Sequence, residues 1–250
     1  MSHRFFLESK PDTAEDTPLT DWVGKTIELD GDQAHHAINV MRFKLGDQIV
    51  LFDGAGVEHV GKIQAVAKKT ISVLIVESRH VPRSVATRLS IAVALPKGDR
   101  QKFLIEKLVE LGTDQLIPLK TNRSVAVASS KVIQRLQKQV IEASKQCGRN
   151  RLMKITESKT LAQLNDLLES GDNDCQRLVA DPYSGKPIVE LVAGSANGFV
   201  VAVGPEGGFD ESEVALLRIN GFEPLSLGPT ILRIETACLA VASILGIGRE

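Results

Sequence analysis

The stretch 198–209, GFVVAVGPEGGF, and the stretch 224–237, PLSLGPTILRIETA, decide the expected fold of this chain of 250 residues. Each runs from a short apolar strand into a turn that contains glycine, and then into a helix. Ligands of open α/β sheets bind beyond the carboxyl ends of the strands. A single glycine turn is equally well explained as a tight connection, but two together predict an α/β fold with a ligand site at these turns.

The first turn predicts a site built largely from backbone. Gly204 and Gly207 allow main-chain atoms to approach a ligand closely, because they carry no Cβ atom. Asp210 and Glu213 have the spacing of a capping box, which predicts a helix over 211–219.

The second turn repeats this plan. Leu227 and Gly228 end a strand, and Glu235 with Thr236 is expected to open an apolar helix over 237–247. Neither turn has the spacing G-x-G-x-x-G, and the chain contains no G-x-x-x-x-G-K-[ST] motif, so the sequence argues against a Rossmann dinucleotide site and a P-loop.

The chain from residue 89 onward alternates strand and helix patterns, which predicts a mostly parallel sheet with helices on both faces. Besides the two glycine-turn units, the expected strands are 89–95, 115–119, 154–156 and 178–180, and the expected helices are 99–111, 130–147, 161–168 and 187–192.

Residues 1–76 are predicted to form a smaller β-rich unit, with a helix at 33–43 and a hairpin turn at Asp53-Gly54. A small β-barrel is the natural outcome. The polar segment 77–88 is predicted to link this unit to the α/β domain at 89–250. The expected strands are 4–8, 25–29, 48–52, 57–66 and 70–76.

Charge is distributed unevenly along the chain. Residues 1–82 hold 9 Lys and Arg against 12 Asp and Glu, residues 83–160 hold 16 against 6, and residues 161–250 hold 5 against 13, so the local balances are −3, +10 and −8. A basic stretch in a nearly neutral protein indicates a polyanionic partner such as nucleic acid. The alternative, a solvated helical face, usually mixes both signs.

Metal and disulfide sites are not indicated by the sequence. The three cysteines have no C-x-x-C spacing, and the five histidines form no ligand pair such as H-E-x-x-H. No apolar run approaches 18 residues, and the N-terminus lacks the apolar core of a signal peptide. We therefore expect a cytoplasmic protein without a metal site.

The two glycine turns carry a resemblance to a known family. GPEGGF at 204–209, followed by LSLGPTILRIETA at 225–237, resembles the cofactor-binding knot of SPOUT-class methyltransferases, and most closely the family that methylates N3 of a uridine in small-subunit ribosomal RNA. The opening R-F-F at 4–6 and the strings P-K-G-D-R at 96–100 and E-K-x-x-E-L-G at 106–112 also match. The resemblance implies a deep trefoil knot in the C-terminal SPOUT domain, an N-terminal PUA-like RNA-binding β-barrel and a homodimer.

The resemblance also implies the cofactor S-adenosylmethionine. This sulfonium cation has no phosphate, which suits the acidic C-terminal part of the chain. Glu206 and Glu235 would oppose the sulfonium charge, or instead pair with Arg233 or cap a helix. The cofactor contacts that the family motif places on this sequence are Gly204, Glu206, Gly207, Leu227, Gly228, Leu232, Glu235, Thr236 and Ala237.

RNA contacts are expected mainly from the basic stretch. The helix predicted at 130–147 places Arg135 and Lys138 on one basic stripe, where they would contact phosphates and position RNA without reading its sequence. For Lys97 and Arg100 the alternative is that their turn only caps a helix. The full set of expected RNA contacts is Arg42, Lys97, Arg100, Arg123, Arg135, Lys138, Arg149 and Arg151.

Methyl transfer requires a positioned acceptor nitrogen and the loss of its imide proton. A cationic group beside the adjacent carbonyl oxygens would stabilise the resulting anion, and Arg123 and Arg233 are the candidates. The resemblance implies a 16S ribosomal RNA uridine-N3 methyltransferase acting within the small ribosomal subunit. The rivals are a related enzyme acting on transfer RNA or a ribose hydroxyl, and a non-catalytic RNA-binding or ribosome-assembly module.

Overall fold

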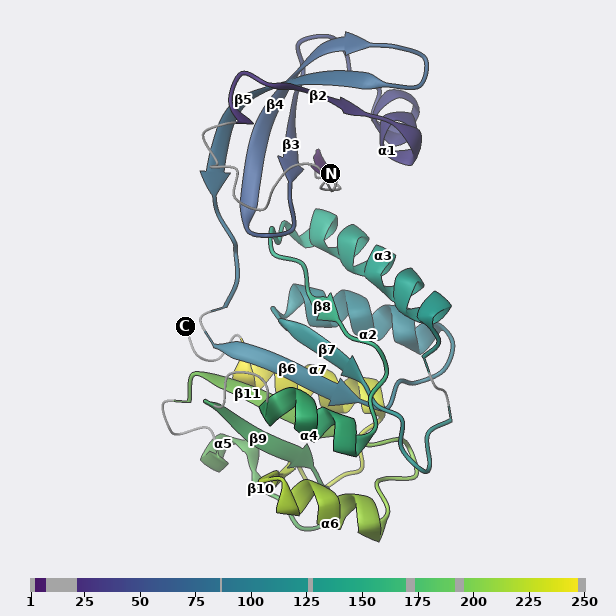
Figure 1. The fold of residues 1–250 in the computed structure, drawn as a ribbon, viewed down its shortest axis with the longest axis vertical. Coiled ribbons are helices and arrows are strands. Elements are labelled where there is room, and N and C mark those ends of the chain that lie inside the picture. Colours follow the sequence, from purple (N-terminus) through teal and green to yellow (C-terminus); the bar gives the residue numbers. More distant parts are fainter. Residues whose placement is uncertain are drawn as a thin grey trace. The chain divides into compact units, whose positions relative to one another are not determined.

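The computed structural model describes residues 3–7, 22–85, 87–125, 128–169, 174–191 and 196–246 (Figure 1). The chain divides into two compact units. The β unit is formed by Met1–Ser84 with Ser144–Leu152, and the α/β unit is formed by Val85–Ala143 with Met153–Glu250. The sequence did not indicate that residues 144–152 pack with the first unit. The limits predicted for the functional domains stay a prediction.

The β unit contains a mixed five-stranded sheet. Its strands are β1 (Arg4–Phe6), β2 (Thr26–Leu29), β3 (Gln48–Phe52), β4 (Val57–Val66) and β5 (Ile71–His80). They lie in the order β1-β3-β4-β5-β2, with β1 parallel to β3 and the other neighbours antiparallel. Because β1 and β2 are edge strands in the described part of the chain, the predicted barrel is present as an open sheet.

The core of the β unit follows the period of its strands. Ile49 and Leu51 of β3, with Ile71, Val73 and Ile75 of β5, are buried in one cluster. Alternate residues of a strand point to the same face of its sheet, so each strand contributes every second side chain to this core.

The helix predicted at 33–43 is divided and ends earlier. A short α-helix, α1 (Gly31–His35), runs into a π-helix, η2 (His36–Val40). The Met41 N–H donates to the His36 carbonyl over 3.0 Å, which is the i→i−5 hydrogen bond of a π-helix. The hydrophobic spacing of a short segment does not distinguish this geometry from an α-helix.

β5 extends into the segment predicted as a linker, 77–88. Residues 77–80 belong to β5, and His80 pairs with Val57 at the start of β4. These residues are mostly polar and lack a strand pattern, but β4 supplies the hydrogen-bond partners that make them a strand.

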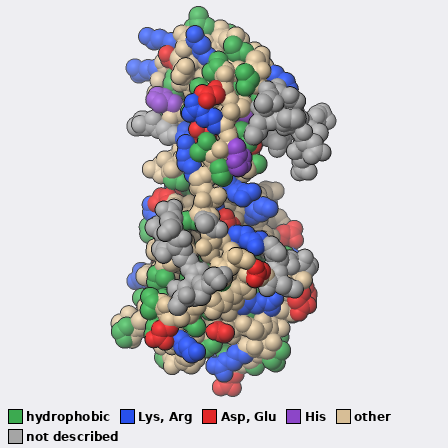
Figure 2. All heavy atoms as spheres, turned by 90° about the vertical axis from the view of Figure 1, so that its left-hand side faces the viewer, with side chains coloured by type: hydrophobic (Ala, Val, Ile, Leu, Met, Phe, Trp, Pro, Cys, Tyr) green, Lys and Arg blue, Asp and Glu red, His purple; other side chains and the backbone are tan. Residues whose placement is uncertain are grey.

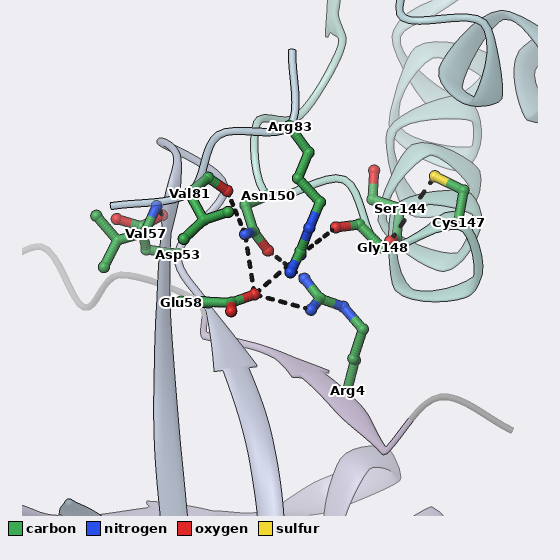
Figure 3. A network of polar contacts seen from close by, with 10 residues as sticks. All are labelled: Arg4, Asp53, Val57, Glu58, Val81, Arg83, Ser144, Cys147, Gly148 and Asn150. Atoms are coloured by element: carbon green, nitrogen blue, oxygen red, sulfur yellow. Dashed lines mark hydrogen bonds and ion pairs between the residues drawn. The ribbon is translucent and has the colours of Figure 1, made fainter. Parts of the chain in front are cut away.

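Glu58 is a buried carboxylate at the centre of a polar network in the β unit (Figure 3). It accepts hydrogen bonds from Arg4 (3.2 Å), Arg83 (2.9 Å) and Asn150 (3.1 Å). Arg83 also donates to the Gly148 carbonyl over 2.8 Å. Burial raises the pKa of Glu58, but the hydrogen bonds from Asn150, Arg4 and Arg83 outweigh it and hold the pKa below its usual value. The network fastens the segment 148–150 to β4.

The α/β unit contains a seven-stranded, all-parallel sheet, as the alternating pattern predicted. Its strands are β6 (Arg88–Val93), β7 (Gln115–Pro118), β8 (Lys154–Ile155), β9 (Cys175–Ala180), β10 (Lys186–Pro187), β11 (Gly198–Val203) and β12 (Glu223–Ser226). The strand order is β10-β12-β9-β11-β6-β7-β8. The chain therefore builds outward from β6 in one direction and then in the other, which creates a switch point between β6 and β11.

Helices cover both faces of this sheet. They are α2 (Asp99–Glu110), α3 (Ser130–Cys147), α4 (Leu161–Glu169), α5 (Ile188–Leu191), α6 (Glu211–Ile219) and α7 (Ile234–Leu245). Leu164 of α4 and Leu217 of α6 share a buried cluster with Val200 and Ala202 of β11. α7 packs on β6, on β11 and against α2, and Figure 1 shows it on the face opposite α4. Strand order does not determine how the chain is threaded, so the knot stays a prediction.

The last helix begins earlier than predicted. The Arg233 carbonyl accepts a hydrogen bond from the Ala237 N–H over 2.8 Å, so α7 starts at Ile234 and includes Glu235 and Thr236. The predicted element ends at residues 8, 192 and 247 lie outside the described residues. None of the described helices combines the length and the apolar character needed to cross a membrane.

Candidate cofactor cavity and nucleic-acid surface

A cavity of about 520 Å³ lies in the α/β unit at the carboxyl ends of three adjacent strands, β9, β11 and β12. Residues from 181–183, 204–209 and 227–232, which follow these strands, line it together with Arg123 and the start of α7. Small-molecule sites of proteins occupy about 300–1,000 Å³ and favour this edge of an α/β sheet. Both glycine turns therefore contribute to one cavity.

The first glycine turn is tightly packed. The Gly208 N–H donates to the Pro205 carbonyl over 2.8 Å. A Cβ atom added to Gly204 would lie 3.1 Å from the ring of Phe209, and one added to Gly207 would lie 3.4 Å from Cδ of Arg123. The space at Gly204 is tight for a side chain, whereas the contact at Gly207 is an ordinary van der Waals distance.

The predicted capping box of α6 is confirmed. Asp210 Oδ1 accepts from the Glu213 N–H over 2.9 Å, and Glu213 Oε2 accepts from the Asp210 N–H over 2.9 Å. The hydroxyl of Ser212 and the amide of Asn122 also donate to Asp210, and these contacts hold the pKa of its carboxyl well below the usual range. The box fixes the point where the turn becomes a helix.

Arg123 lies in the loop after β7 and reaches the first glycine turn. Its Nη1 donates to the Gly207 carbonyl over 2.7 Å, and the residue both lines the cavity and is exposed to solvent. The structure thus brings a cation that sequence reasoning selected to the edge of the cavity.

Arg100, in the first turn of α2, contacts two carboxylates of the glycine turns. Its Nη1 lies 2.6 Å from Oε1 of Glu206 and 3.8 Å from Oε2 of Glu235. The side chain of Glu235 is only 9 % exposed. The ion-pair partner of both acids is therefore Arg100, which the sequence analysis had considered for RNA, and not Arg233.

Two family models match the chain. One described as an RNA methyltransferase domain matches residues 83–246, and one described as an RNA methyltransferase PUA domain matches residues 29–76. The chain belongs to this RNA methyltransferase family. The family predicted from the two glycine turns is thereby confirmed.

Named relatives agree with this assignment. Ribosomal RNA small subunit methyltransferase E of Bacillus subtilis is 32 % identical over 260 residues, which covers 99 % of this chain and 97 % of the relative. A methyltransferase from Legionella pneumophila, solved with the cofactor SAM, has a TM-score of 0.84 at 27 % identity, covering 99 % of this chain and 98 % of that one. The methyltransferase E of Neisseria gonorrhoeae, solved with S-adenosyl methionine, has a TM-score of 0.83 at 28 % identity, covering 97 % and 96 %.

Most of the cofactor contacts predicted for this RNA methyltransferase line the cavity. They are Gly204, Glu206, Gly207, Leu227, Gly228, Leu232 and Ala237. Glu235 and Thr236 are not among the lining residues; Glu235 is buried beside Arg100, and Thr236 is exposed on α7. Arg233 is exposed at the N-cap of α7 and does not line the cavity either. Of the two arginines predicted to stabilise the uracil anion, the structure places only Arg123 at the cavity.

The sequence analysis did not predict the part of the cavity lining that follows β9, at residues 181–183. Asp181 accepts from the Tyr183 N–H over 2.8 Å, which makes an Asx turn, and Tyr183 stands 84 % exposed at the cavity. Arg218 of α6 and Ile231 also line the cavity without having been predicted. The string DPYSG at 181–185 directly follows a predicted strand, so the rule that ligands bind at carboxyl ends was the available signal.

The predicted RNA contacts lie on several elements of the methyltransferase. Lys97 and Lys138 are exposed, and Arg135 is exposed while it donates to Gln101 over 2.9 Å. In the β unit, Arg42 is exposed with a positive φ of 56°, and Arg151 is exposed beside the β3–β4 hairpin, where it forms a bridge with Ala55. On the face drawn in Figure 2, Lys and Arg side chains lie at several places among other side chains.

Arg149 differs from the other predicted RNA contacts. It is only 3 % exposed, so this conformation does not present it to a phosphate. It was predicted because it continues the positive charge beyond α3, which ends at Cys147, and charge along the sequence does not show which side chains are buried. Within the described part of the chain, no group of three His, Cys, Asp or Glu side chains is placed to hold a metal ion.

Proposed function

We propose that this RNA methyltransferase transfers the methyl group of S-adenosylmethionine to N3 of a specific uridine in small-subunit (16S) ribosomal RNA, within the small ribosomal subunit. The observation that carries the proposal is the single cavity formed by both glycine turns, with Arg123 at its edge. The relatives from Bacillus subtilis and Neisseria gonorrhoeae support the class of substrate, because their name refers to small-subunit ribosomal RNA.

The residues of the cavity fit S-adenosylmethionine. The volume of about 520 Å³ suits a molecule of this size. Main chain at Gly204, Gly207 and Gly228 faces the space without Cβ atoms, so amides and carbonyls are available as partners for the cofactor's polar groups. Asp181 and Glu206 supply carboxylates that can face the sulfonium cation, and Arg123 and Arg218 on the same lining balance their charge.

When bound, S-adenosylmethionine supplies a methyl group that is already activated, so the protein must mainly position the acceptor and assist loss of its proton. Arg123 can do this from the cavity edge. Its guanidinium carries a fixed positive charge and is held in place by the Gly207 carbonyl. A uracil carbonyl beside this guanidinium would share its N3 negative charge with a cation, which lowers the free energy of the deprotonated base.

Cationic side chains of both units are proposed to bind phosphates and so position the RNA. They are Lys97, Arg100, Arg135 and Lys138 of the α/β unit, and Arg42 and Arg151 of the β unit. Arg149 would join them only after a rearrangement that exposes it. These contacts explain affinity rather than the choice of nucleotide.

We further propose that the protein is a cytoplasmic homodimer. α7 buries Cys238 and Val241 within the unit but leaves Leu239 and Ile244 partly exposed, so these two apolar side chains are available to contact a second copy. Light scattering coupled to gel filtration tests this directly: a mass of about twice the 27.1 kDa chain supports the dimer, and a mass of one chain contradicts it.

The proposed function is tested by methyl transfer to defined RNAs. Purified protein is incubated with methyl-labelled S-adenosylmethionine and, separately, unmodified small ribosomal subunits, naked small-subunit ribosomal RNA and transfer RNA. Label in ribosomal RNA that is lost in Arg123→Ala supports the proposal. Label in transfer RNA alone would favour the rival substrate, and cofactor binding without label in any RNA would favour a non-catalytic role.

A further inference from the structure

The loop that carries Arg123 is closed by its own side chains. The Ser124 hydroxyl accepts from the Thr121 N–H over 2.9 Å, and the two hydroxyls lie 2.8 Å apart. The Ser124 N–H returns a hydrogen bond to the Thr121 carbonyl over 3.1 Å, and Thr121 is buried. This closed turn leaves Asn122 and Arg123 at its exposed tip.

Asn122 joins this tip to the capping box of α6. Its N–H donates to Glu213 Oε1 over 2.8 Å, and its side-chain amide donates to Asp210 Oδ2 over 2.7 Å. The box itself uses the other two oxygens, Asp210 Oδ1 and Glu213 Oε2. Each carboxylate therefore accepts a hydrogen bond within the capping box through one oxygen, and a hydrogen bond from Asn122 through the other.

Arg123 is held on its other side by the glycine turn. It donates to the Gly207 carbonyl over 2.7 Å, and its Cδ lies where a Cβ on Gly207 would make contact at 3.4 Å. Gly207, Asp210 and Glu213 belong to one continuous segment that lines the cavity or follows it. The tip of the β7 loop is thus fastened to this segment at both of its exposed residues.

We propose that Asn122 is a positioning residue, which holds Arg123 over the cavity through the capping box of α6. The inference rests on the function proposed above, in which Arg123 acts on the uracil. An arginine side chain has several rotatable bonds and loses substantial rotamer entropy when it is fixed, so a rigid main-chain anchor beside it makes the productive placement more populated. Any residue at 122 retains the main-chain bond to Glu213, but only a side-chain donor reaches Asp210 Oδ2.

A set of variants at the Asn122–Asp210 contact separates an effect on the position of Arg123 from an effect on the stability of the fold. Asn122→Ala removes the donor. Asn122→Asp replaces it with a carboxylate facing Asp210. The double variant Asn122→Asp with Asp210→Asn exchanges donor and acceptor, and it preserves the start of α6 because asparagine is as good an N-cap residue as aspartate. Melting temperature and calorimetric cofactor affinity are measured for every variant, so that a loss of stability or of cofactor binding is separated from a loss of rate.

Single-turnover methyl transfer at saturating S-adenosylmethionine gives the first readout. Displacement of a catalytic group by about 1 Å can lower the rate by about 100-fold, so we expect Asn122→Ala to lose about 10- to 100-fold in rate with an unchanged cofactor affinity. Asn122→Asp should lose at least as much, and the exchanged pair should recover most of the rate. In an Arg123→Ala background, Asn122→Ala should have no further effect. A full rate in Asn122→Ala, or an equal loss in the two backgrounds, would overturn the inference.

A second readout does not depend on activity. Crystal structures of the wild-type protein and of Asn122→Ala should differ at Arg123, whose guanidinium leaves the Gly207 carbonyl in the variant and keeps it in the exchanged pair. An Arg123–Gly207 contact retained in Asn122→Ala contradicts the inference, whatever RNA the enzyme modifies. If wild-type protein methylates no RNA while the structures differ as expected, the proposed function fails and the positioning role of Asn122 stands.

Discussion

Arg100 Nη1 lies 2.6 Å from Glu206 Oε1 and joins the first turn of α2 to the glycine turn at the cavity. The same nitrogen lies 3.8 Å from Oε2 of Glu235, a buried oxygen that accepts no hydrogen bond from the residues that the structure describes. One arginine therefore compensates an exposed carboxylate that lines the cavity and a buried one behind it.

This asymmetry predicts that removing Arg100 and removing Glu206 affect the stability of the fold unequally. Arg100→Ala leaves the buried carboxylate of Glu235 uncompensated and should lower the urea midpoint clearly, whereas Glu206→Ala removes an exposed partner and should change it little. Urea unfolding followed by circular dichroism measures both. Glu235→Gln in the Arg100→Ala background should restore part of the midpoint, and equal midpoints for the two single variants would contradict this explanation.

Gly185 and Gly221 provide a contrast between steric overlap and backbone strain. A Cβ on Gly185 would lie 2.2 Å from the carbonyl carbon of Leu225 in β12, whereas Gly221 has a φ of +77° and open space around its Cβ position. Gly221→Ala should cost about 1–2 kcal/mol of unfolding free energy, as expected for a left-handed alanine. Gly185→Ala should cost more and also weaken cofactor binding, because β12 borders the cavity. Denaturant unfolding measures the stability of the two variants, and calorimetry measures their cofactor affinity. A smaller loss of unfolding free energy in Gly185→Ala than in Gly221→Ala would contradict the close packing of Gly185 against β12.

The Glu58 network predicts a defined pH dependence of stability. The folded pKa of Glu58 lies below its unfolded value, so its ionised form stabilises the fold fully above about pH 4.3, and this contribution is lost as the pH falls through the folded pKa. Glu58→Gln should therefore reduce the unfolding free energy at pH 7 by about 1–3 kcal/mol, since Arg4 remains buried without its carboxylate partner and keeps the hydrogen bond to Asn150.

The difference between Glu58→Gln and wild type should shrink below about pH 4.3. Urea titrations between about pH 3.5 and 7 provide the test. Glu77→Gln, which removes an exposed ion pair with Arg79, is the matched control and should remain close to wild type throughout. A Glu58→Gln deficit that is the same at all pH values would show that the carboxylate charge is not what the network uses.

Neutralising the exposed face of α3 should flatten the salt dependence of RNA binding. For each phosphate that the protein no longer neutralises, the slope of log K against log salt should fall by about 0.7 on single-stranded RNA. Arg135→Gln and Lys138→Gln are therefore expected to weaken binding to every RNA and to reduce this slope together. Filter binding at several salt concentrations measures it, with the exposed Lys186→Gln of β10 as the control. Unchanged slopes in the double variant would exclude α3 from the RNA surface.

Local sequence signals predicted the elements whose structure depends on local interactions. The capping box of Asp210 and Glu213 follows from a spacing of three residues, and β3, β4 and α6 have the predicted limits. The alternation of strand and helix patterns along the chain also predicted the parallel sheet, and the two glycine turns predicted the place of the cavity. Each of these signals can be recognised in the sequence without knowing which distant residues come into contact.

The features that were missed depend on partners far away in the sequence. Arg100 finds Glu206, and Asn122 finds Asp210, only because the sheet brings the ends of β6, β7 and β11 together. Arg149 is buried because the segment 144–152 packs with the β unit. No local pattern encodes these contacts, since each requires the completed tertiary fold.

The central claim is tested most directly by identifying the methylated nucleoside. Unmodified small ribosomal subunits are incubated with the protein and methyl-labelled S-adenosylmethionine, the ribosomal RNA is digested, and the labelled nucleoside is identified by mass spectrometry. The account predicts label in 3-methyluridine, with strong loss in Arg123→Ala and an unchanged cofactor affinity. Label in a different base or in a ribose methyl group, or an Arg123→Ala variant as fast as wild type, would contradict it.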